Sequence, residues 1–143
     1  MIRGIASATC GRGEDVNELP VVLVIEDEYA IQGIVEDALT EGGFVADILS
    51  SGEEALTLFR GGGKNYKALV TDVALKGRLN GWEVAAKIRE KDPGFPVIYM
   101  SGANADEWAS RGVPNSIMLA KPFAPAQIVT AVAQLLNSAP PPT

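Results

Sequence analysis

The sequence of 143 residues contains no histidine, and its only cysteine is Cys10. The lack of histidine excludes Ser-His-Asp hydrolysis and zinc sites that use histidine ligands. A single cysteine rules out a disulfide framework and a metal site built from several thiolates. No apolar stretch approaches the roughly 20 residues that a membrane-spanning helix needs, and the first residues are too weakly apolar for a signal peptide. We therefore expect a protein of the reducing cytoplasm that makes no membrane contact.

Basic residues are in the minority, with 12 Lys and Arg against 18 Asp and Glu, and the formal net charge is −6. Nucleic acids bind to basic surfaces, so this balance argues against a direct nucleic-acid partner. Hydrophobic residues make up 47% of the chain, which is enough to fold one domain around one core. Because glycines interrupt any pattern near the start, we expect a flexible leader over residues 1–19, a domain over residues 20–137 and a flexible tail over residues 138–143.

Short apolar runs and amphipathic segments alternate along this domain. Five runs are predicted to be strands: Val21–Ile25, Phe44–Leu49, Ala68–Asp72, Pro96–Ser101 and Ser116–Leu119. A helix is predicted after each strand, and four of the helices have these start signals: Ser51 with Glu54, Asn80 with Glu83, Asn104 with Glu107, and Pro125. This order of elements is typical of an α/β protein whose parallel sheet is covered by helices on both faces.

Polar side chains stand where four of the predicted strands end. Glu26 and Asp27 follow the first strand, Asp72 ends the third, Ser101 ends the fourth, and Lys121 follows the fifth. Ligands of such sheets bind beyond the carboxyl ends of the strands. We therefore expect these side chains to meet at one edge of the sheet, with the acids at its rim rather than buried in the core.

This combination of charges is typical of phosphoryl chemistry. Three carboxylates placed together repel one another unless a cation neutralises them, and Mg²⁺ is commonly held by carboxylates, waters and a phosphate. A carboxylate can also attack phosphorus and form an aspartyl-phosphate, whose oxygens need a cation and a hydrogen-bond donor such as Lys121 and Ser101. Taken singly, each residue also fits a plainer interpretation, namely a solvated acid at a strand end, a turn residue or a surface lysine.

Five short motifs occur in order along the predicted elements: IEDE at Ile25–Glu28, VTDVAL at Val70–Leu75, NGWE at Asn80–Glu83, MSG at Met100–Gly102 and KPF at Lys121–Phe123. Each motif alone is weak, and their specificity comes from their order on the right elements. With them, residues 20–137 resemble a stand-alone receiver domain of a two-component response regulator, similar to the chemotaxis regulators. The resemblance implies a flavodoxin-like, doubly wound sheet of five parallel strands in the order 2-1-3-4-5, with five helices.

The resemblance also implies a role for each polar residue at the sheet edge. Asp72 is the phosphoacceptor, Lys121 contacts the phosphoryl group, and Ser101 is the switch hydroxyl. The implied Mg²⁺ ligands are all oxygen donors: Glu26, Asp27, Asp72 and the backbone carbonyl of Ala74. Such a chain catalyses only its own Mg²⁺-dependent phosphorylation and dephosphorylation and is not otherwise an enzyme.

The partners implied by the resemblance are proteins. A histidine kinase or a phosphotransfer protein donates the phosphoryl group, and phosphorylation switches a surface for a downstream protein target; a phosphorylation-dependent dimer stays open. Because too few residues follow residue 137 for an output domain, we expect output through a protein contact, or else a role as a phosphate sink. Two other functions stay open, a Mg²⁺-dependent phosphohydrolase and an interaction module that keeps the fold without being phosphorylated.

Three features depart from the family pattern. No proline closely follows Asp72, and the loop of residues 75–81 is one residue longer than expected. Met118 stands three residues before the lysine, where the family usually has its switch aromatic. Ala74 and Ala103 are small residues at two positions that border the path of the water that removes the phosphoryl group. These departures concern, in turn, the geometry of the loop, the coupling of the switch and the rate of dephosphorylation.

Overall fold

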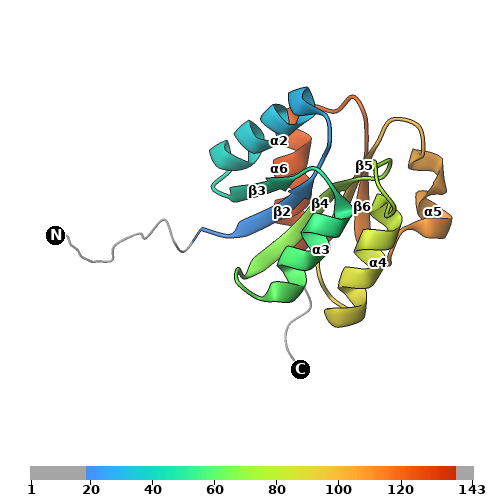
Figure 1. Ribbon diagram of the computed structural model, residues 1–143. Coiled ribbons are helices and arrows are strands. Elements are labelled where there is room, and N and C mark those ends of the chain that lie inside the picture. Colours follow the sequence, from blue (N-terminus) through green and yellow to red (C-terminus); the bar gives the residue numbers. More distant parts are fainter. Residues whose placement is uncertain (1–18, 138–143) are drawn as a thin grey trace.

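Strands and helices alternate along the chain in the computed structural model, which describes residues 19–137 (Figure 1). The strands are β2 (Val21–Ile25), β3 (Val45–Leu49), β4 (Tyr66–Asp72), β5 (Val97–Ser101) and β6 (Ser116–Ala120). The α-helices are α2 (Tyr29–Glu41), α3 (Gly52–Gly61), α4 (Gly81–Lys91), α5 (Trp108–Arg111) and α6 (Pro125–Asn137), and the 3-10 turn η2 (Ala105–Glu107) precedes α5. None of the helices in this part of the chain is long and apolar enough to cross a membrane. The predicted tail, and all but the last residue of the predicted leader, lie outside the described residues.

The five strands form one parallel sheet in the order β3-β2-β4-β5-β6, which is the predicted order 2-1-3-4-5. The largest difference in strand bounds is at β4, which begins at Tyr66 instead of Ala68. The chain runs outward from β2 to β3 and then crosses back to β4, so the strand order reverses at this point. The carboxyl ends of β2 and β4 are neighbours at the reversal, where α/β sheets bind their ligands.

Helices cover both faces of the sheet, as predicted, and the core has two layers (Figure 1). On one face, Leu56 of α3 and Ile88 of α4 belong to the same buried cluster as Leu23 of β2. On the other face, α2 and α6 share a buried cluster with Val22 and Val24. Alternate residues of β2 therefore point into opposite layers, which explains why the sequence of this strand is a continuous apolar run.

Helix α3 begins and ends where the sequence predicts. The hydroxyl of Ser51 accepts the N–H of Glu54 at 3.2 Å, but the Glu54 carboxylate turns to this hydroxyl rather than to the backbone, so the predicted capping box is half formed. Gly62, in the predicted glycine stop, has a left-handed φ of +70° and forms the C-cap.

The start of α4 is fixed against the end of β4. Asn80 accepts the N–H of Glu83 at 2.9 Å, and the Glu83 carboxylate accepts the N–H of Asn80 at 2.9 Å, so this predicted capping box is complete. Gly81 follows, and a Cβ at this position would collide with the carbonyl oxygen of Asp72. Because glycine permits this approach, α4 begins directly beside the strand end.

The segment after β5 differs from the prediction at its start. The side chain of Asn104 accepts no capping hydrogen bond; instead its amide donates to the carboxylate of Glu107 at 2.8 Å. The segment forms η2 and a single turn of α5, and the indole N–H of Trp108 donates to the hydroxyl of Ser116 in β6 at 2.9 Å. The predicted side-chain cap is therefore wrong, because the capping side chain is engaged by Glu107 and the segment is held by its contact with β6.

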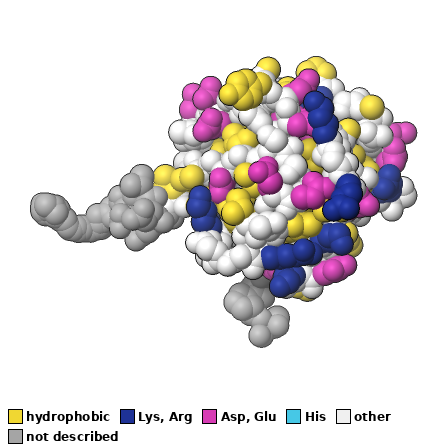
Figure 2. All heavy atoms as spheres, in the orientation of Figure 1, with side chains coloured by type: hydrophobic (Ala, Val, Ile, Leu, Met, Phe, Trp, Pro, Cys, Tyr) yellow, Lys and Arg dark blue, Asp and Glu magenta, His cyan; other side chains and the backbone are white. Residues whose placement is uncertain are grey.

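The basic residues are concentrated in one part of the chain. Apart from Arg111 and Lys121, every Lys and Arg among the described residues lies between residues 60 and 91. Figure 2 shows Lys and Arg side chains gathered in the lower part of the view, over the region of α3 and α4 in Figure 1. The negative net charge of the sequence therefore does not produce a uniformly acidic surface.

Candidate functional site

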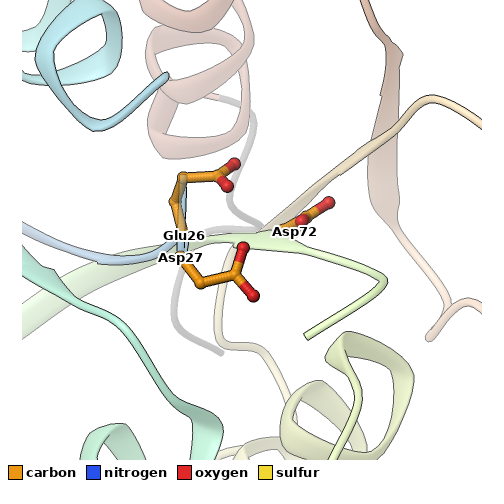
Figure 3. A group of neighbouring side chains, drawn as sticks. All are labelled: Glu26, Asp27 and Asp72. Carbon is orange, nitrogen blue, oxygen red and sulfur yellow. The ribbon is translucent and has the colours of Figure 1, made fainter. Parts of the chain in front are cut away.

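Three carboxylates lie together at the carboxyl ends of β2 and β4 (Figure 3). Glu26 and Asp27 directly follow β2, and Asp72 is the last residue of β4. One carboxylate oxygen of each residue lies within 4.8 Å of the other two. Figure 3 shows the side chains of Glu26 and Asp27 leaving the chain in different directions, with Asp72 beside them. The structure thus brings together the acids that the sequence pattern predicts to meet.

Two of these acids are more buried than the sequence pattern suggests. Glu26 is 0% exposed and Asp72 is 7% exposed, whereas Asp27 is half-buried. The acids lie at the predicted edge of the sheet, but the expectation that they are not buried is wrong for Glu26 and Asp72. A buried carboxylate needs an opposite charge or hydrogen-bond donors, and Glu26 has both.

Lys121 supplies the opposite charge. Its ammonium nitrogen lies 3.0 Å from Oε1 of Glu26 and 3.4 Å from Oδ1 of Asp72. The Oε2 atom of Glu26 accepts the backbone N–H of Glu28 at 2.9 Å. The backbone N–H of Lys121 donates to the carbonyl of Ser101 at 2.9 Å. Lys121 therefore links the ends of β2 and β4 through its side chain and the end of β5 through its backbone.

The packing of these charges shifts their proton equilibria. Burial raises the pKa of Asp72 from 3.8 to about 6; the carboxylate of Glu26 adds to the rise, and Lys121 opposes it. Burial acts to lower the pKa of Lys121, but the hydrogen bond to Glu26 and the charge of Asp72 outweigh burial and raise it. At neutral pH, Asp72 is therefore largely ionised, although burial and Glu26 disfavour its ionised form, and Lys121 is charged.

Ser101 is buried at the end of β5, the strand beside β4. Its hydroxyl oxygen accepts the backbone N–H of Asn104 at 2.7 Å. The sequence gives no signal for this contact, because a backbone donor leaves no mark in the side-chain pattern. Ser101 thus lies at the predicted edge, and its hydroxyl is tied to the segment that leads into η2 and α5.

The loop between β4 and α4 runs beside the carboxylates. The N–H of Gly81 donates to the carbonyl of Val73 at 2.8 Å and closes the base of this loop. Ala74, the predicted carbonyl ligand, is exposed. The N–H of Lys76 donates to Oδ2 of Asp27 at 3.3 Å. A backbone hydrogen bond therefore joins the loop directly to the acidic cluster.

One acidic residue outside the predicted site contacts the same loop. Glu53 of α3 accepts the N–H of Arg78 at 2.8 Å and that of Leu79 at 3.1 Å. Sequence reasoning missed this residue, because its partners are backbone atoms 25 and 26 residues away. The contact joins the start of α3 to the loop that follows Asp72.

Met118 occupies the position at which an aromatic residue is usual. It pairs with Tyr99 across β5 and β6 and packs, partly buried, on the core layer under α3 and α4. Tyr99 is fully buried, and its hydroxyl accepts the N–H of Val113 at 3.0 Å. Tyr99 is thus fixed by packing and by a hydrogen bond. Although it lies only two positions before Ser101, it is not free to rotate as a substitute for the switch aromatic that Met118 replaces.

The donor atoms at this edge suit a hard divalent cation. Oxygens bound to one Mg²⁺ lie about 3–4 Å apart, since each Mg–O distance is about 2.0–2.1 Å. Carboxylate oxygens within 4.8 Å of one another need only small movements to share such an ion. Because both oxygens of Glu26 already accept hydrogen bonds, Asp27 and Asp72 are better placed for direct contact. The residues present therefore fit Mg²⁺.

Comparison with known proteins identifies the family. The model of the response regulator receiver domain matches residues 22–133. A response regulator receiver protein from Sinorhizobium medicae WSM419, known from a crystal structure, is 42% identical, with a TM-score of 0.82 over 86% of this chain and 98% of that chain. Transcriptional regulatory protein TcrA of Mycobacterium tuberculosis is 35% identical over 116 residues, which are 80% of this chain and 43% of that protein. Transcriptional regulatory protein CusR of Escherichia coli K12 is 29% identical over 118 residues, which are 81% of this chain and 51% of that protein.

The matched region extends from β2 into α6 and contains every residue of the candidate site. This chain spans about half the length of the curated relatives, so the similarity concerns one domain of those proteins. The strand order and the acidic cluster agree with this similarity. The chain therefore belongs to the family of response regulator receiver domains, the phosphorylation-regulated signalling domains of two-component systems.

Proposed function

We propose that Asp72 accepts a phosphoryl group from a histidine kinase or a phosphotransfer protein and that the modified domain acts on a downstream protein target. The observation that supports this proposal is the position of the Asp72 carboxylate, 3.4 Å from the ammonium of Lys121 and within a cluster of three acids. A phosphoryl group bound there needs positive charge on more than one side, and Lys121 with one divalent cation supplies it. Membership of the receiver family favours this reaction over hydrolysis of a separate phosphate ester.

The nucleophile is the ionised carboxylate of Asp72. One carboxylate oxygen attacks the phosphorus of a phosphohistidine, so that an O–P bond forms while the N–P bond breaks and the leaving imidazole takes up a proton from solvent. With a pKa of about 6 in the absence of metal, most of the carboxylate is already ionised at pH 7 and can act as a nucleophile. Lys121 is close enough to pair with an oxygen of the transferred group.

Magnesium is the proposed second cation. Asp27, Asp72 and the backbone carbonyl of Ala74 would hold it directly, and Glu26 would contact it through water, because both oxygens of Glu26 already have partners. When bound, the ion neutralises the carboxylates and the phosphoryl oxygens that approach them. Lys121 alone leaves the cluster with an excess of negative charge, which would repel the incoming phosphoryl group.

Ser101 is the proposed link between phosphorylation and the protein surface. If its hydroxyl turns to donate to a phosphoryl oxygen, it releases the N–H of Asn104 that it now accepts at 2.7 Å. This N–H is partly buried, and losing its hydrogen bond costs about 0.5–1.5 kcal/mol, so we expect η2 and α5 to adjust. We expect the surface formed by α5, β6 and α6 to change, while Met118 repacks at small cost because its side chain is unbranched.

Two small residues favour a short-lived phosphorylated state. Ala74 and Ala103 are both exposed, and they stand two residues after Asp72 and two residues after Ser101, on the loops that follow β4 and β5. Neither has a side chain long enough to cover a phosphoryl group and exclude the attacking water. The phosphorylated form should therefore lose its phosphoryl group readily.

The test is the mass of the intact protein after incubation with acetyl phosphate and Mg²⁺. Wild type is expected to gain one phosphoryl group and Asp72→Asn none, because the amide is not a nucleophile. Asp37→Asn, which changes an exposed aspartate of α2, is the matched control and should be modified like wild type. The assignment fails if Asp72→Asn gains the same mass. Steady release of phosphate from an ester would favour a phosphohydrolase, and no reaction with acetyl phosphate or with any of a panel of kinases would favour an interaction module.

A further inference from the structure

The loop between β4 and α4 donates backbone hydrogen bonds to the carboxylate of Glu53, a residue of α3. Glu53, in the first turn of α3, accepts the N–H groups of Arg78 and Leu79 through one oxygen, Oε2, at 2.8 and 3.1 Å. Successive backbone N–H groups that converge on one anion form a concave site similar to the nests that bind phosphate groups. Hydrogen bonds from its own N–H and from that of Arg78 hold the pKa of Glu53 below its usual value, so the carboxylate is charged at neutral pH.

Gly77 allows the loop to pass this close to the carboxylate. Its φ of +101° lies in the region that favours glycine, and a Cβ there would be 3.0 Å from Oε1 of Glu53. Leu75 and Leu79, on either side of this glycine, pack on the core layer under α3 and α4. Apolar contacts therefore hold both ends of the turn, and the carboxylate of Glu53 binds the backbone of its second half.

The same loop borders the carboxylate site. The N–H of Lys76 donates to Asp27 at 3.3 Å, and Ala74 precedes it by two residues. In the described part of the chain, Asp27 and Glu53 are the side chains that accept hydrogen bonds from the N–H groups of residues 74–79. No proline stiffens these residues. The conformation of the loop thus depends on two carboxylates, one inside the site and one outside it.

We propose that Glu53 is a positioning residue, whose carboxylate holds residues 74–79 so that the carbonyl of Ala74 and the carboxylate of Asp27 face the same magnesium ion. This role rests on the proposed magnesium site. Groups that orient metal ligands without touching the metal change metal affinity by about 10–100-fold when they are removed. Because Glu53 acts on the site through a loop, Glu53→Ala should weaken magnesium binding by about tenfold, the lower end of this range.

Glu54 provides a matched control for this experiment. It is the next residue in the same first turn, and its carboxylate lies 3.5 Å from the hydroxyl of Ser51 instead of on the loop. Replacing either acid by alanine removes one favourable negative charge from the N-terminus of α3, so both variants lose a similar contribution to helix stability. A difference between the two variants therefore reports the loop contact and not the helix.

Wild type, Glu53→Ala and Glu54→Ala are titrated with MgCl₂ while amide chemical shifts are followed, and hydrogen exchange of the Arg78 and Leu79 amides is measured without metal. We expect the Kd for Mg²⁺ to rise about tenfold in Glu53→Ala and to stay near that of wild type in Glu54→Ala. The two amides should exchange faster in Glu53→Ala alone. Glu53→Gln keeps one acceptor oxygen and should recover part of the affinity.

The outcomes separate this role from the magnesium site itself. If wild type binds Mg²⁺ and the two alanine variants bind it equally well, or are weakened by the same factor, the positioning role is overturned and the magnesium site stands. If wild type shows no shift with Mg²⁺, the site is overturned, and the role of Glu53 with it. Unchanged exchange of the Arg78 and Leu79 amides in Glu53→Ala would also overturn the role, because the loop would then be held by other contacts.

Discussion

Replacing Asp72 by asparagine should make the metal-free fold more stable at neutral pH, although it removes the proposed reactive group. Asp72 is 7% exposed and lies beside the carboxylate of Glu26, and burial is the main reason that its pKa rises. A pKa that is higher in the folded than in the unfolded protein means that folding favours the protonated form. The rise from 3.8 to about 6 corresponds to about 3 kcal/mol of stability that is lost when the carboxylate ionises.

The sign of this effect sets its dependence on pH. Below pH 3.8, Asp72 is mostly protonated in both states, so wild type and Asp72→Asn should have similar free energies of unfolding. As the pH rises from 3.8 to about 6, the unfolded chain loses this proton first, and wild type becomes progressively less stable than the variant. Above this window the carboxylate is ionised in both states, and the difference should level off at about 3 kcal/mol.

Urea unfolding at a series of pH values measures the difference. Because small domains have urea slopes of about 1–3 kcal/mol/M, the midpoint of Asp72→Asn should exceed that of wild type by roughly 1–3 M at pH 7. The exposed-site variant Asp37→Asn should not show this pH dependence. Mg²⁺ should narrow the gap, because it binds the ionised carboxylate of wild type and stabilises that fold. Equal midpoints for wild type and Asp72→Asn at pH 7 without metal would refute the reasoning.

The remaining predictions concern the cation, the contact of α4 with the strand end, and the switch. Lys121→Ala should lower the free energy of unfolding by about 3–5 kcal/mol in urea, because it leaves a fully buried carboxylate without its cation; a loss below about 1 kcal/mol would mean that the pair contributes little. Gly81→Ala should lower the midpoint of thermal unfolding, because its Cβ would collide with the end of β4. Gly33→Ala, in α2 with open space around it, should raise that midpoint and stabilise the fold by about 0.5–1 kcal/mol. If both midpoints move in the same direction, the close approach of α4 to the strand end is contradicted. Ser101→Ala should reduce the amide shifts that phosphorylation causes in α5 and β6, while Met118→Leu should leave them nearly intact; the opposite result would make methionine the switch.

The sheet and the meeting of the site residues follow from the sequence because both depend on strand pattern. A continuous apolar run such as Val21–Ile25 indicates a strand buried on both faces, and parallel strands place their carboxyl ends at one edge. This common edge brings Glu26, Asp27 and Asp72 together, with one carboxylate oxygen of each within 4.8 Å of the others. The strand order, in contrast, is implied only by the resemblance to the receiver family, since alternating strands and helices fit more than one parallel topology.

Burial and backbone contacts could not be predicted in the same way. An acid at a strand end has the same sequence signature whether it is solvated by water or paired with a distant cation. Glu26 is paired with a lysine 95 residues away. The contacts of Ser101 and Glu53 have backbone N–H groups as donors, and every residue except proline carries such a group. The partner of each side chain is therefore selected by the tertiary structure, and the spacing of residue types contains no signal for it.

One contact with the phosphoryl group cannot drive the proposed switch to completion by itself. A bound group shifts two conformations only by the free energy with which it favours one of them. A hydrogen bond to a charged group contributes about 1.5–3 kcal/mol, so a single contact with the phosphoryl group brings a state populated at about 1% at most to about even with its alternative. Reaching about 99% requires about 5.5 kcal/mol, so further contacts must form in the phosphorylated state. The Ser101 hydroxyl is the group that can supply one, because it is already bonded to the segment that leads into α5. Phosphorylated Ser101→Ala should therefore populate a mixture of the two surface conformations instead of staying wholly in the unphosphorylated one.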